Sequence, residues 1–180
     1  MEAKAILYHS NEAEKCDMFI TKTDYLIESQ NLKDDKWLGT GMYFWDNLGN
    51  AKWWNEKQRQ RNSEKIYSIA IANVNLENLL DLTDPDVYFN IENIWKMICI
   101  RERKNTQIPL GNKLNILWDV GNFSRYYDVV KVFGRYINIF SGGLFDFDIN
   151  SKTAEPTMTA RAIYNVKSSD CIVKKAYLEE

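Results

Sequence analysis

Histidine and cysteine are both scarce in this chain, and their scarcity excludes several kinds of active site. His9 is the only histidine among 180 residues, so a metal site built from several histidines is excluded and a histidine-based triad has a single candidate. Cys16, Cys99 and Cys171 lie far apart and form no Cys-x-x-Cys pair, which argues against zinc. An odd number of widely spaced cysteines predicts reduced thiols and a cytoplasmic protein.

Long apolar runs and the common nucleotide-binding signatures are also missing. No apolar run approaches the roughly 18–20 residues of a membrane helix, and the N-terminus lacks the apolar core of a secretory signal. We therefore expect no membrane partner. The sequence has no G-x-x-x-x-G-K-[ST] loop, no Rossmann glycine triplet and no G-x-S-x-G elbow. Its net charge of −2 argues against binding nucleic acid through overall charge alone.

What the chain does contain is an ordinary globular composition with many aromatic rings. Hydrophobic residues make up 45% and charged residues 27% of the sequence, which predicts one domain over residues 1–180 with a sizeable core. Aromatic residues reach 13%, with six tryptophans. Flat, rigid rings suit both hydrophobic cores and pockets that stack planar ligands.

The hydrophobic pattern predicts strands and helices without regular β-α-β alternation. β-branched and aromatic runs predict strands over residues 5–8, 42–45, 65–74, 79–82, 129–133, 136–140, 161–166 and 171–173. Apolar spacing and capping residues predict a helical turn over 12–15 and helices over 50–61, 85–104 and 114–120. Residues 142–156 are polar and predict a surface loop. The expected fold class is α+β.

A glycine-rich turn followed by aromatic residues is the most distinctive stretch. Gly39-Thr40-Gly41 leads directly into Met42-Tyr43-Phe44-Trp45. Glycine tolerates positive φ and lets a ligand approach the backbone closely, and the residues after it are typical of a short buried strand. The stretch therefore predicts a pocket wall that presents the ring of Tyr43 or Trp45.

Four short motifs, in order along the chain, resemble those of one family. They are Tyr8-His9-Ser10, Gly39-Thr40-Gly41-Met42-Tyr43-Phe44, Asn50-Ala51-Lys52-Trp53 and Ala160-Arg161-Ala162-Ile163-Tyr164-Asn165. They resemble Y-H-G-[ST], G-x-G-[IM]-Y-F, S-A-x-[YW] and E-Y-I-V-Y-N of the ADP-ribosyltransferases of the poly(ADP-ribose) polymerase-like, or H-Y-E, branch. The resemblance implies two packed, mostly antiparallel sheets with flanking helices, and NAD as the substrate without a metal.

The resemblance also implies which residues bind NAD. His9 would hydrogen-bond the ribose on the adenine side, and the backbone at Ser10 would hold the nicotinamide carboxamide. The rings of Tyr43 and Trp53 would sandwich the nicotinamide. Taken singly, each ring suits a packed core better, and the order of the motifs is what favours NAD. The implied cofactor-binding residues are His9, Ser10, Gly39, Thr40, Gly41, Tyr43, Asn50 and Trp53.

The sequence departs from the family pattern at the catalytic glutamate. Where the late motif begins with Glu, this chain has Ala160, which cannot stabilise the oxocarbenium-like charge that develops on the ribose when the nicotinamide bond breaks. Glu155 on the preceding loop is one possible substitute, although Pro156 and its distance along the chain make that awkward. The protein could instead work without the acid, with His9 and Tyr43 as the remaining catalytic residues. The hypothesis we favour is that Ala160 is an inactivating replacement of Glu.

The target of the expected transfer is least defined by the sequence. The chain resembles bacterial or phage-related ADP-ribosylating toxins, as in toxin–antitoxin or phage-defence systems, which implies an antitoxin protein as partner. A basic stretch favours RNA or DNA as acceptor over protein, with Trp45 or Trp54 stacking a base, although a solvated helix face accounts for these charges equally well. The basic residues are Lys52, Lys57, Arg59, Arg61 and Lys65. The alternatives are a protein-modifying transferase and a catalytically silent NAD- or nucleotide-binding module that acts through protein contacts.

Overall fold

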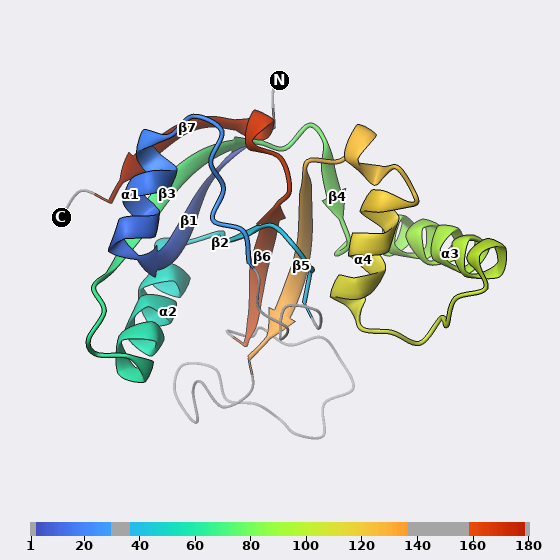
Figure 1. Cartoon of the computed structure of the whole chain (residues 1–180), viewed down its shortest axis with the longest axis horizontal. Helices are drawn as coiled ribbons and strands as arrows, with labels where there is room; N and C mark the ends of the chain where they lie inside the picture. The colour runs from blue at the N-terminus through green and yellow to red at the C-terminus, as the bar shows by residue number, and fades with distance from the viewer. Residues whose placement is uncertain (1–2, 30–36, 137–158, 179–180) are drawn as a thin grey trace.

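The structure of the chain, a computed structural model, describes residues 3–29, 37–136 and 159–178. Within these residues it confirms an α+β fold, with one sheet and four α-helices (Figure 1). The expected strand over 136–140, apart from Tyr136, lies outside the described residues, as do the expected loop over 142–156 and Glu155. No helix within the described ranges is long and apolar enough to cross a membrane.

A seven-stranded sheet forms the centre of the molecule. Its neighbouring strands run antiparallel, except that β4 and β5 are parallel. The expected pair of packed sheets is not found among the described residues, because the pairing of Tyr8 with Trp45 joins all the strands into one hydrogen-bonded order. That order is β4 (Leu79–Asp81), β5 (Val129–Arg135), β6 (Ala160–Val166), β2 (Met42–Trp45), β1 (Lys4–Glu12), β3 (Tyr67–Asn75) and β7 (Ile172–Tyr177).

β1 and β2 meet at a single residue pair, Tyr8 with Trp45. On its other edge β1 pairs with β3 along its whole length, and β2 pairs with β6 over all of its residues. The sheet therefore consists of two well-paired groups of strands, β1-β3-β7 and β4-β5-β6-β2, that join at one point. Beyond this point β1 and β2 separate, and the candidate site lies where they do.

The helices divide between these two groups of strands. α1 (Ala13–Thr21) and α2 (Leu48–Arg61) lie against β1 and β3, whereas α3 (Pro85–Glu102) and α4 (Leu110–Asp119) lie on the side of β4 and β5 (Figure 1). Short 3-10 turns follow at Phe123–Arg125 and Ser169–Cys171. The predicted helical turn over 12–15 belongs to the longer α1, and α4 begins four residues before its predicted start.

Capping residues explain where the two longer helices begin. The Asn47 side chain accepts a hydrogen bond from the Asn50 backbone N–H at 2.9 Å, so α2 begins two residues before its predicted start. The Asp84 carboxylate accepts from the Asp86 backbone N–H at 2.8 Å, and Pro85 occupies the first helical position of α3. Arg103, with φ of 51°, ends α3 in the left-handed conformation.

Two hydrophobic clusters hold the helices on the sheet. The first packs α1 against β1, β2 and β3 through Phe19, Leu7 and Phe44, each at most 1% exposed. The second packs α3 and α4 on the other group of strands, with Trp95 and Leu114 at its centre. Because β2 contributes Phe44 to one cluster and Trp45 to the other, this short strand is fixed from both faces of the sheet.

Candidate functional site

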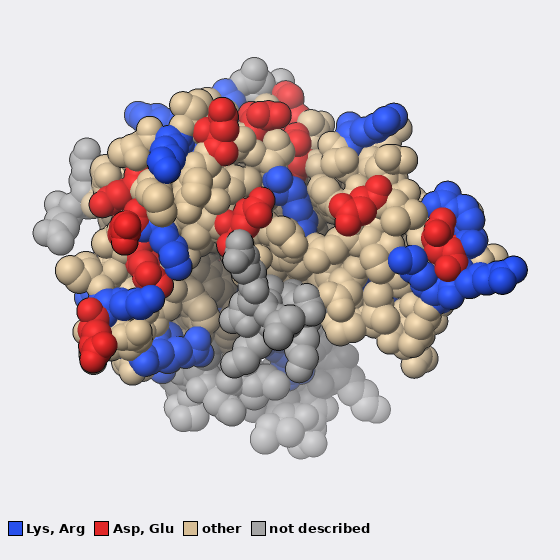
Figure 2. All heavy atoms as spheres, viewed as in Figure 1, with Lys and Arg blue, Asp and Glu red and all other residues tan. Residues whose placement is uncertain are grey.

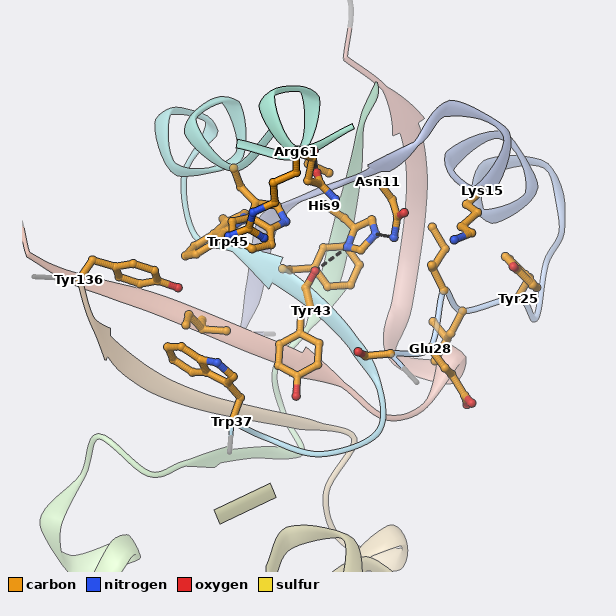
Figure 3. Close-up of a pocket in the computed structure, with 18 residues that line it drawn as sticks. His9, Asn11, Lys15, Tyr25, Glu28, Trp37, Tyr43, Trp45, Arg61 and Tyr136 are labelled. Atoms are coloured by element: carbon orange, nitrogen blue, oxygen red, sulfur yellow. Dashed lines mark hydrogen bonds between the residues drawn. The ribbon is translucent and has the colours of Figure 1, made fainter. Parts of the chain in front are cut away.

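A cavity of about 1310 Å³ opens where β1 and β2 separate (Figure 3). It is larger than the roughly 300–1,000 Å³ of a typical small-molecule site. Its walls come from β1, α1, the segment after α1, β2 and α2, together with Trp37, Tyr136 and Ile163. Polar side chains line the part near β1, whereas tryptophan and tyrosine rings line the part near β2, α2 and Tyr136. The cavity therefore offers a ligand both hydrogen-bonding groups and flat apolar surfaces.

His9 links β1 to β2 inside this cavity. Its Nδ1 lies 2.6 Å from the Tyr43 carbonyl oxygen and its Nε2 lies 3.2 Å from the Asn11 Nδ2 (Figure 3). A carbonyl only accepts and an amide nitrogen only donates, so the ring is neutral with its proton on Nδ1. Burial lowers the pKa of His9 to about 4, against a smaller raising effect of the Tyr43 carbonyl. His9 is thus a hydrogen-bonded neutral imidazole.

Beyond the pairing of Tyr8 with Trp45, the chain around the start of β2 takes hydrogen bonds from groups other than the β1 backbone. The Tyr43 carbonyl accepts from His9 Nδ1, and the Gly41 carbonyl accepts from the Ser29 backbone N–H at 3.0 Å. A side chain and a loop amide thereby replace the strand partner that β1 would otherwise supply. This replacement lets the two strands separate without leaving buried acceptors unpaired.

A second polar network ties β1 to α2 at the side of the cavity. The Ser10 hydroxyl donates to Gln58 Oε1 at 2.7 Å and accepts from the Asn55 Nδ2 at 3.0 Å. Ser10 and Asn55 are both buried, so these hydrogen bonds satisfy polar groups that water does not reach. Ser10 and Gln58 line the cavity, whereas Asn55 holds them from behind.

The predicted glycine turn does require glycine, but it lies beside the cavity. Gly39 has φ of 71° and Gly41 has φ of 137°, conformations that side chains rarely adopt. A Cβ on Gly39 would overlap the Asn115 side chain and lie 2.6 Å from the Gly111 carbonyl oxygen. A Cβ on Gly41 would overlap the side chain of Asn165, a fully buried amide that has no hydrogen-bond partner among the described residues.

Several side chains hold this turn in place. The Tyr43 hydroxyl donates to the Gly39 carbonyl at 2.7 Å and accepts from the Leu38 backbone N–H at 3.1 Å. The Lys167 ammonium donates to the carbonyls of Leu38 and Thr40. Burial lowers the pKa of Lys167 to about 8. The hydroxyl of Tyr43 therefore has a structural task, while its ring lies in the cavity wall (Figure 3).

Aromatic rings from β2, from α2 and from the connecting segments at Trp37 and Tyr136 form one cluster at the other side of the cavity. Trp45 lies 6.4 Å from both Trp53 and Trp54, and 5.8 Å from Tyr136, between ring centroids. Tyr136 in turn stacks on Trp37 at 6.1 Å. Burial raises the pKa of Tyr136 to about 12. The rings of this cluster are those of Trp37, Trp45, Trp53, Trp54 and Tyr136.

Trp53 does not line the cavity, and its neighbour Trp54 does. The Arg161 guanidinium lies over the Trp53 ring at 4.1 Å and near the Tyr136 ring at 5.0 Å. Arg161 is only 7% exposed, and its Nη1 has no hydrogen-bond partner among the described residues. Of the two rings expected to sandwich the nicotinamide, Tyr43 therefore lines the cavity and Trp53 does not.

Of the five basic residues singled out in the sequence, Arg61 lies in the cavity wall. Its guanidinium is 5.1 Å from the Trp54 ring. The described contacts engage three of the others: Arg59 donates to the Tyr67 carbonyl and Lys65 pairs with Glu12 at 2.7 Å, while Lys57 reaches only Gln60. A second cation in the wall is Lys15, which no motif singled out. It comes from α1, which the pattern predicted only as one turn.

The cavity wall contains a carboxylate, but it is not at position 160, where the family motif has its catalytic glutamate. Ala160 is exposed at the start of β6, pairs with Arg135 and lies outside the cavity wall, three residues before Ile163. Glu28 is the one acidic residue among the described residues of the wall. It belongs to an irregular segment, so no strand or helix periodicity pointed to it.

The structure thus brings together part of the predicted site. His9, Ser10 and Tyr43 share the cavity wall with Trp45 and Trp54, the two rings predicted to stack a base, and with Asn11, Gln58 and Glu28, which sequence reasoning missed. The remaining predicted residues that the structure describes lie outside the wall: Gly39, Thr40, Gly41, Asn50, Trp53 and Ala160. The described residues contain no group of three His, Cys, Asp or Glu side chains that could hold a metal.

Comparison with known proteins adds no family to this description. No protein-family profile, curated protein or solved structure matches the chain. The interpretation of the cavity therefore depends on its own residues and on the motifs quoted above.

Proposed function

We propose that the chain is an ADP-ribosyltransferase that binds NAD in the cavity between β1 and β2. The observation that carries this proposal is the hydrogen bond of 2.6 Å between His9 Nδ1 and the Tyr43 carbonyl oxygen. These two residues correspond to the first two letters of the H-Y-E pattern and lie 34 positions apart in the sequence. Both line a cavity with room for a dinucleotide and an acceptor group. The mixture of hydrogen-bonding and aromatic walls suits the ribose and ring parts of NAD.

The reaction breaks one bond and forms another at ribose C1. The bond from C1 to the nicotinamide nitrogen breaks, and its electron pair stays with the nicotinamide. The acceptor atom then bonds to C1 and gives up its proton. Positive charge develops on the ribose between these events, as in glycoside cleavage. Glu28 is the described wall residue whose negative charge would stabilise that cation.

We propose nucleic acid, RNA or DNA, as the acceptor. The Arg61 guanidinium lies over the half-buried Trp54 ring, and both residues line the cavity. A cation together with aromatic rings is a combination that binds single-stranded nucleic acid through phosphate and base. Lys15 adds a second positive charge on the opposite wall. In a cell, an enzyme of this kind would act as a toxin in the cytoplasm and would need an antitoxin.

Release of nicotinamide from NAD, and transfer of labelled ADP-ribose to RNA, DNA and protein fractions, test the proposal together. We expect label in nucleic acid, and loss of both signals in Glu28→Gln. Trp54→Leu should weaken NAD binding or transfer, whereas the matched control Trp118→Leu should not, because Trp118 packs against Phe123 and Tyr127 away from the cavity. Label confined to protein would contradict the choice of nucleic acid.

Ala160 favours a second candidate, a silent module that binds NAD without cleaving it. Alanine at this position supplies neither charge nor hydrogen bond. Ala160→Glu distinguishes the two: a large gain in nicotinamide release supports an inactivated transferase, and no gain above background rejects that explanation. NAD binding by calorimetry without any release, in the wild type and in Ala160→Glu, supports the silent module. Absence of NAD binding overturns both candidates.

A further inference from the structure

Helix α3 has apolar residues on two opposite faces. Its inner face packs on the core through Ile91, Trp95, Ile98 and Cys99, all buried. Its outer face presents Phe89, Met97 and Ile100, with exposed fractions of 58%, 62% and 80%. These three lie within one stripe at helical spacing, together with the exposed Asn93. An exposed apolar stripe of this kind on a folded domain marks an interaction surface.

The charges along α3 are segregated by sign. The first half and its cap carry Asp84, Asp86 and Glu92 and no basic residue. The second half and its end carry four basic residues and one acidic one, and Figure 2 shows the basic side chains over the end of α3 that projects from the sheet. They are Lys96, Arg101, Arg103 and Lys104, with Glu102. The helix dipole adds to this effect, because the N-terminal end of α3 carries a partial positive charge and the C-terminal end a partial negative charge. Each end would therefore attract the opposite end of an antiparallel neighbour.

We propose that α3 docks on α3 of a second copy of the chain, antiparallel, about a two-fold axis beside Asn93. In this arrangement Phe89 of each copy faces Met97 of the other. The same register places Asp86 of each copy beside Arg101 of the other, while Glu92 keeps its ion pair with Lys96 of its own helix at 3.5 Å. Asn93 lies at the axis and faces its own copy, where one polar residue fixes the register. In this one register, apolar positions on one copy of α3 face apolar positions on the other, and acidic positions lie near basic ones.

The charge pattern selects this occupant over others. A parallel pair of α3 helices would bring like charges together, which destabilises a helix pair. An acidic partner protein would match the second half of α3 but would oppose Asp86 and Glu92 in the first half. A second copy in antiparallel orientation matches both halves. An α-helix of 18 residues is about 27 Å long, so a single helix pair would be a small interface.

Sedimentation of the whole chain tests the pairing, and a cysteine scan tests its register. We expect a dimer at high concentration and a monomer for Ile100→Asp, with circular dichroism confirming that the variant is folded. Asn93→Cys should cross-link to itself under oxidation. Phe89→Cys should cross-link only when mixed with Met97→Cys. The native cysteines Cys16, Cys99 and Cys171 are buried, so the wild type should not cross-link.

Charge reversal gives the sharper version of this test. Asp86→Lys and Arg101→Glu should each sediment as monomers, while their equimolar mixture should form a dimer. A wild-type chain that stays monomeric at the highest soluble concentration overturns the proposal, as does a mixture that stays monomeric. No residue of α3 lines the cavity, so failure of the pairing leaves the proposed function untouched.

Discussion

The two ends of β6 each carry a cation that lies on aromatic rings, but the hydrogen bonding of the two cations differs. Arg161, near the start of the strand, lies over Trp53 and beside Tyr136, and its Nη1 has no partner among the described residues. Lys167, just after the end, lies 5.1 Å from the Trp118 ring and donates to two backbone carbonyls. The end with Lys167 holds the glycine turn, and the end with Arg161 borders the cavity.

This difference separates a structural region from a region able to respond to a ligand. A buried cation with its hydrogen bonds satisfied stabilises one conformation, whereas a buried guanidinium with an unused donor carries a desolvation cost. Natural proteins tolerate such a cost mostly near functional sites. The comparison therefore predicts that substitutions at the turn destabilise the fold strongly, and that substitution of Arg161 does not.

The largest effect is expected for Gly39→Ala. Positive φ and overlap with Asn115 and the Gly111 carbonyl should together cost about 3–5 kcal/mol of unfolding free energy, measured by urea denaturation. The control is Gly49→Ala in α2, where the added Cβ meets only Asn47 Oδ1 at 3.4 Å. It should leave stability unchanged or raise it by about 0.5–1 kcal/mol. Equal losses in both variants would show that the turn is not specially constrained.

Acidification should be the next largest effect, through His9. Its pKa is lowered by burial to about 4, so between pH 6.5 and 4 the unfolded chain binds a proton that the folded chain does not. Stability therefore falls as pH drops through this window, by up to about 3 kcal/mol. His9→Gln can still donate to the Tyr43 carbonyl but cannot titrate, so it should show a shallower decline in urea denaturation between pH 7 and 4.5. Identical declines would contradict the buried neutral imidazole.

Lys167→Met should cost about 2 kcal/mol. It removes the donor to the Leu38 and Thr40 carbonyls while keeping the apolar length of the side chain. Chemical denaturation at pH 7 measures the loss, and hydrogen exchange should show faster exchange at the turn. A variant as stable as the wild type would show that water replaces the ammonium without cost.

The smallest effect is expected for Arg161→Met. Replacing a buried, incompletely bonded guanidinium by an apolar side chain of similar length should change stability by less than about 1 kcal/mol, with stabilisation the favoured sign. The same denaturation assay as for Lys167→Met makes the two directly comparable. A loss of more than about 2 kcal/mol would remove the contrast between the two ends of β6.

Much of the fold follows from the sequence because local signals agree with the final packing. The alternating run over residues 65–74 gives β3, and Asp84 with Pro85 starts α3 where capping predicts. Gly39 and Gly41 have the positive φ that their pattern suggested. The joining of the strands into one sheet was not predictable, because it depends on the single pairing of Tyr8 with Trp45, and one residue pair leaves no periodic pattern.

The candidate site was predictable where it lies on regular strands and not elsewhere. His9 and Tyr43 follow from strand-end motifs, and the structure joins them by a hydrogen bond. The choice between Trp53 and Trp54 could not be made from sequence, because it depends on which ring Arg161 covers, and Arg161 is more than 100 residues away along the chain. Glu28 lies in an irregular segment, where the residue type does not predict the direction in which the side chain points.

The separation of β1 from β2 also gives the sheet an edge in its interior. Edges normally lie at the outside of a sheet, where their free backbone groups invite an added strand. Here the His9 side chain donates to the Tyr43 carbonyl of β2, and the Ser29 amide donates to the Gly41 carbonyl just before β2, so no neighbouring strand backbone binds either carbonyl. A ligand with amide groups could compete for these carbonyls one at a time, so β2 can contribute backbone recognition without any rearrangement of the strands around it.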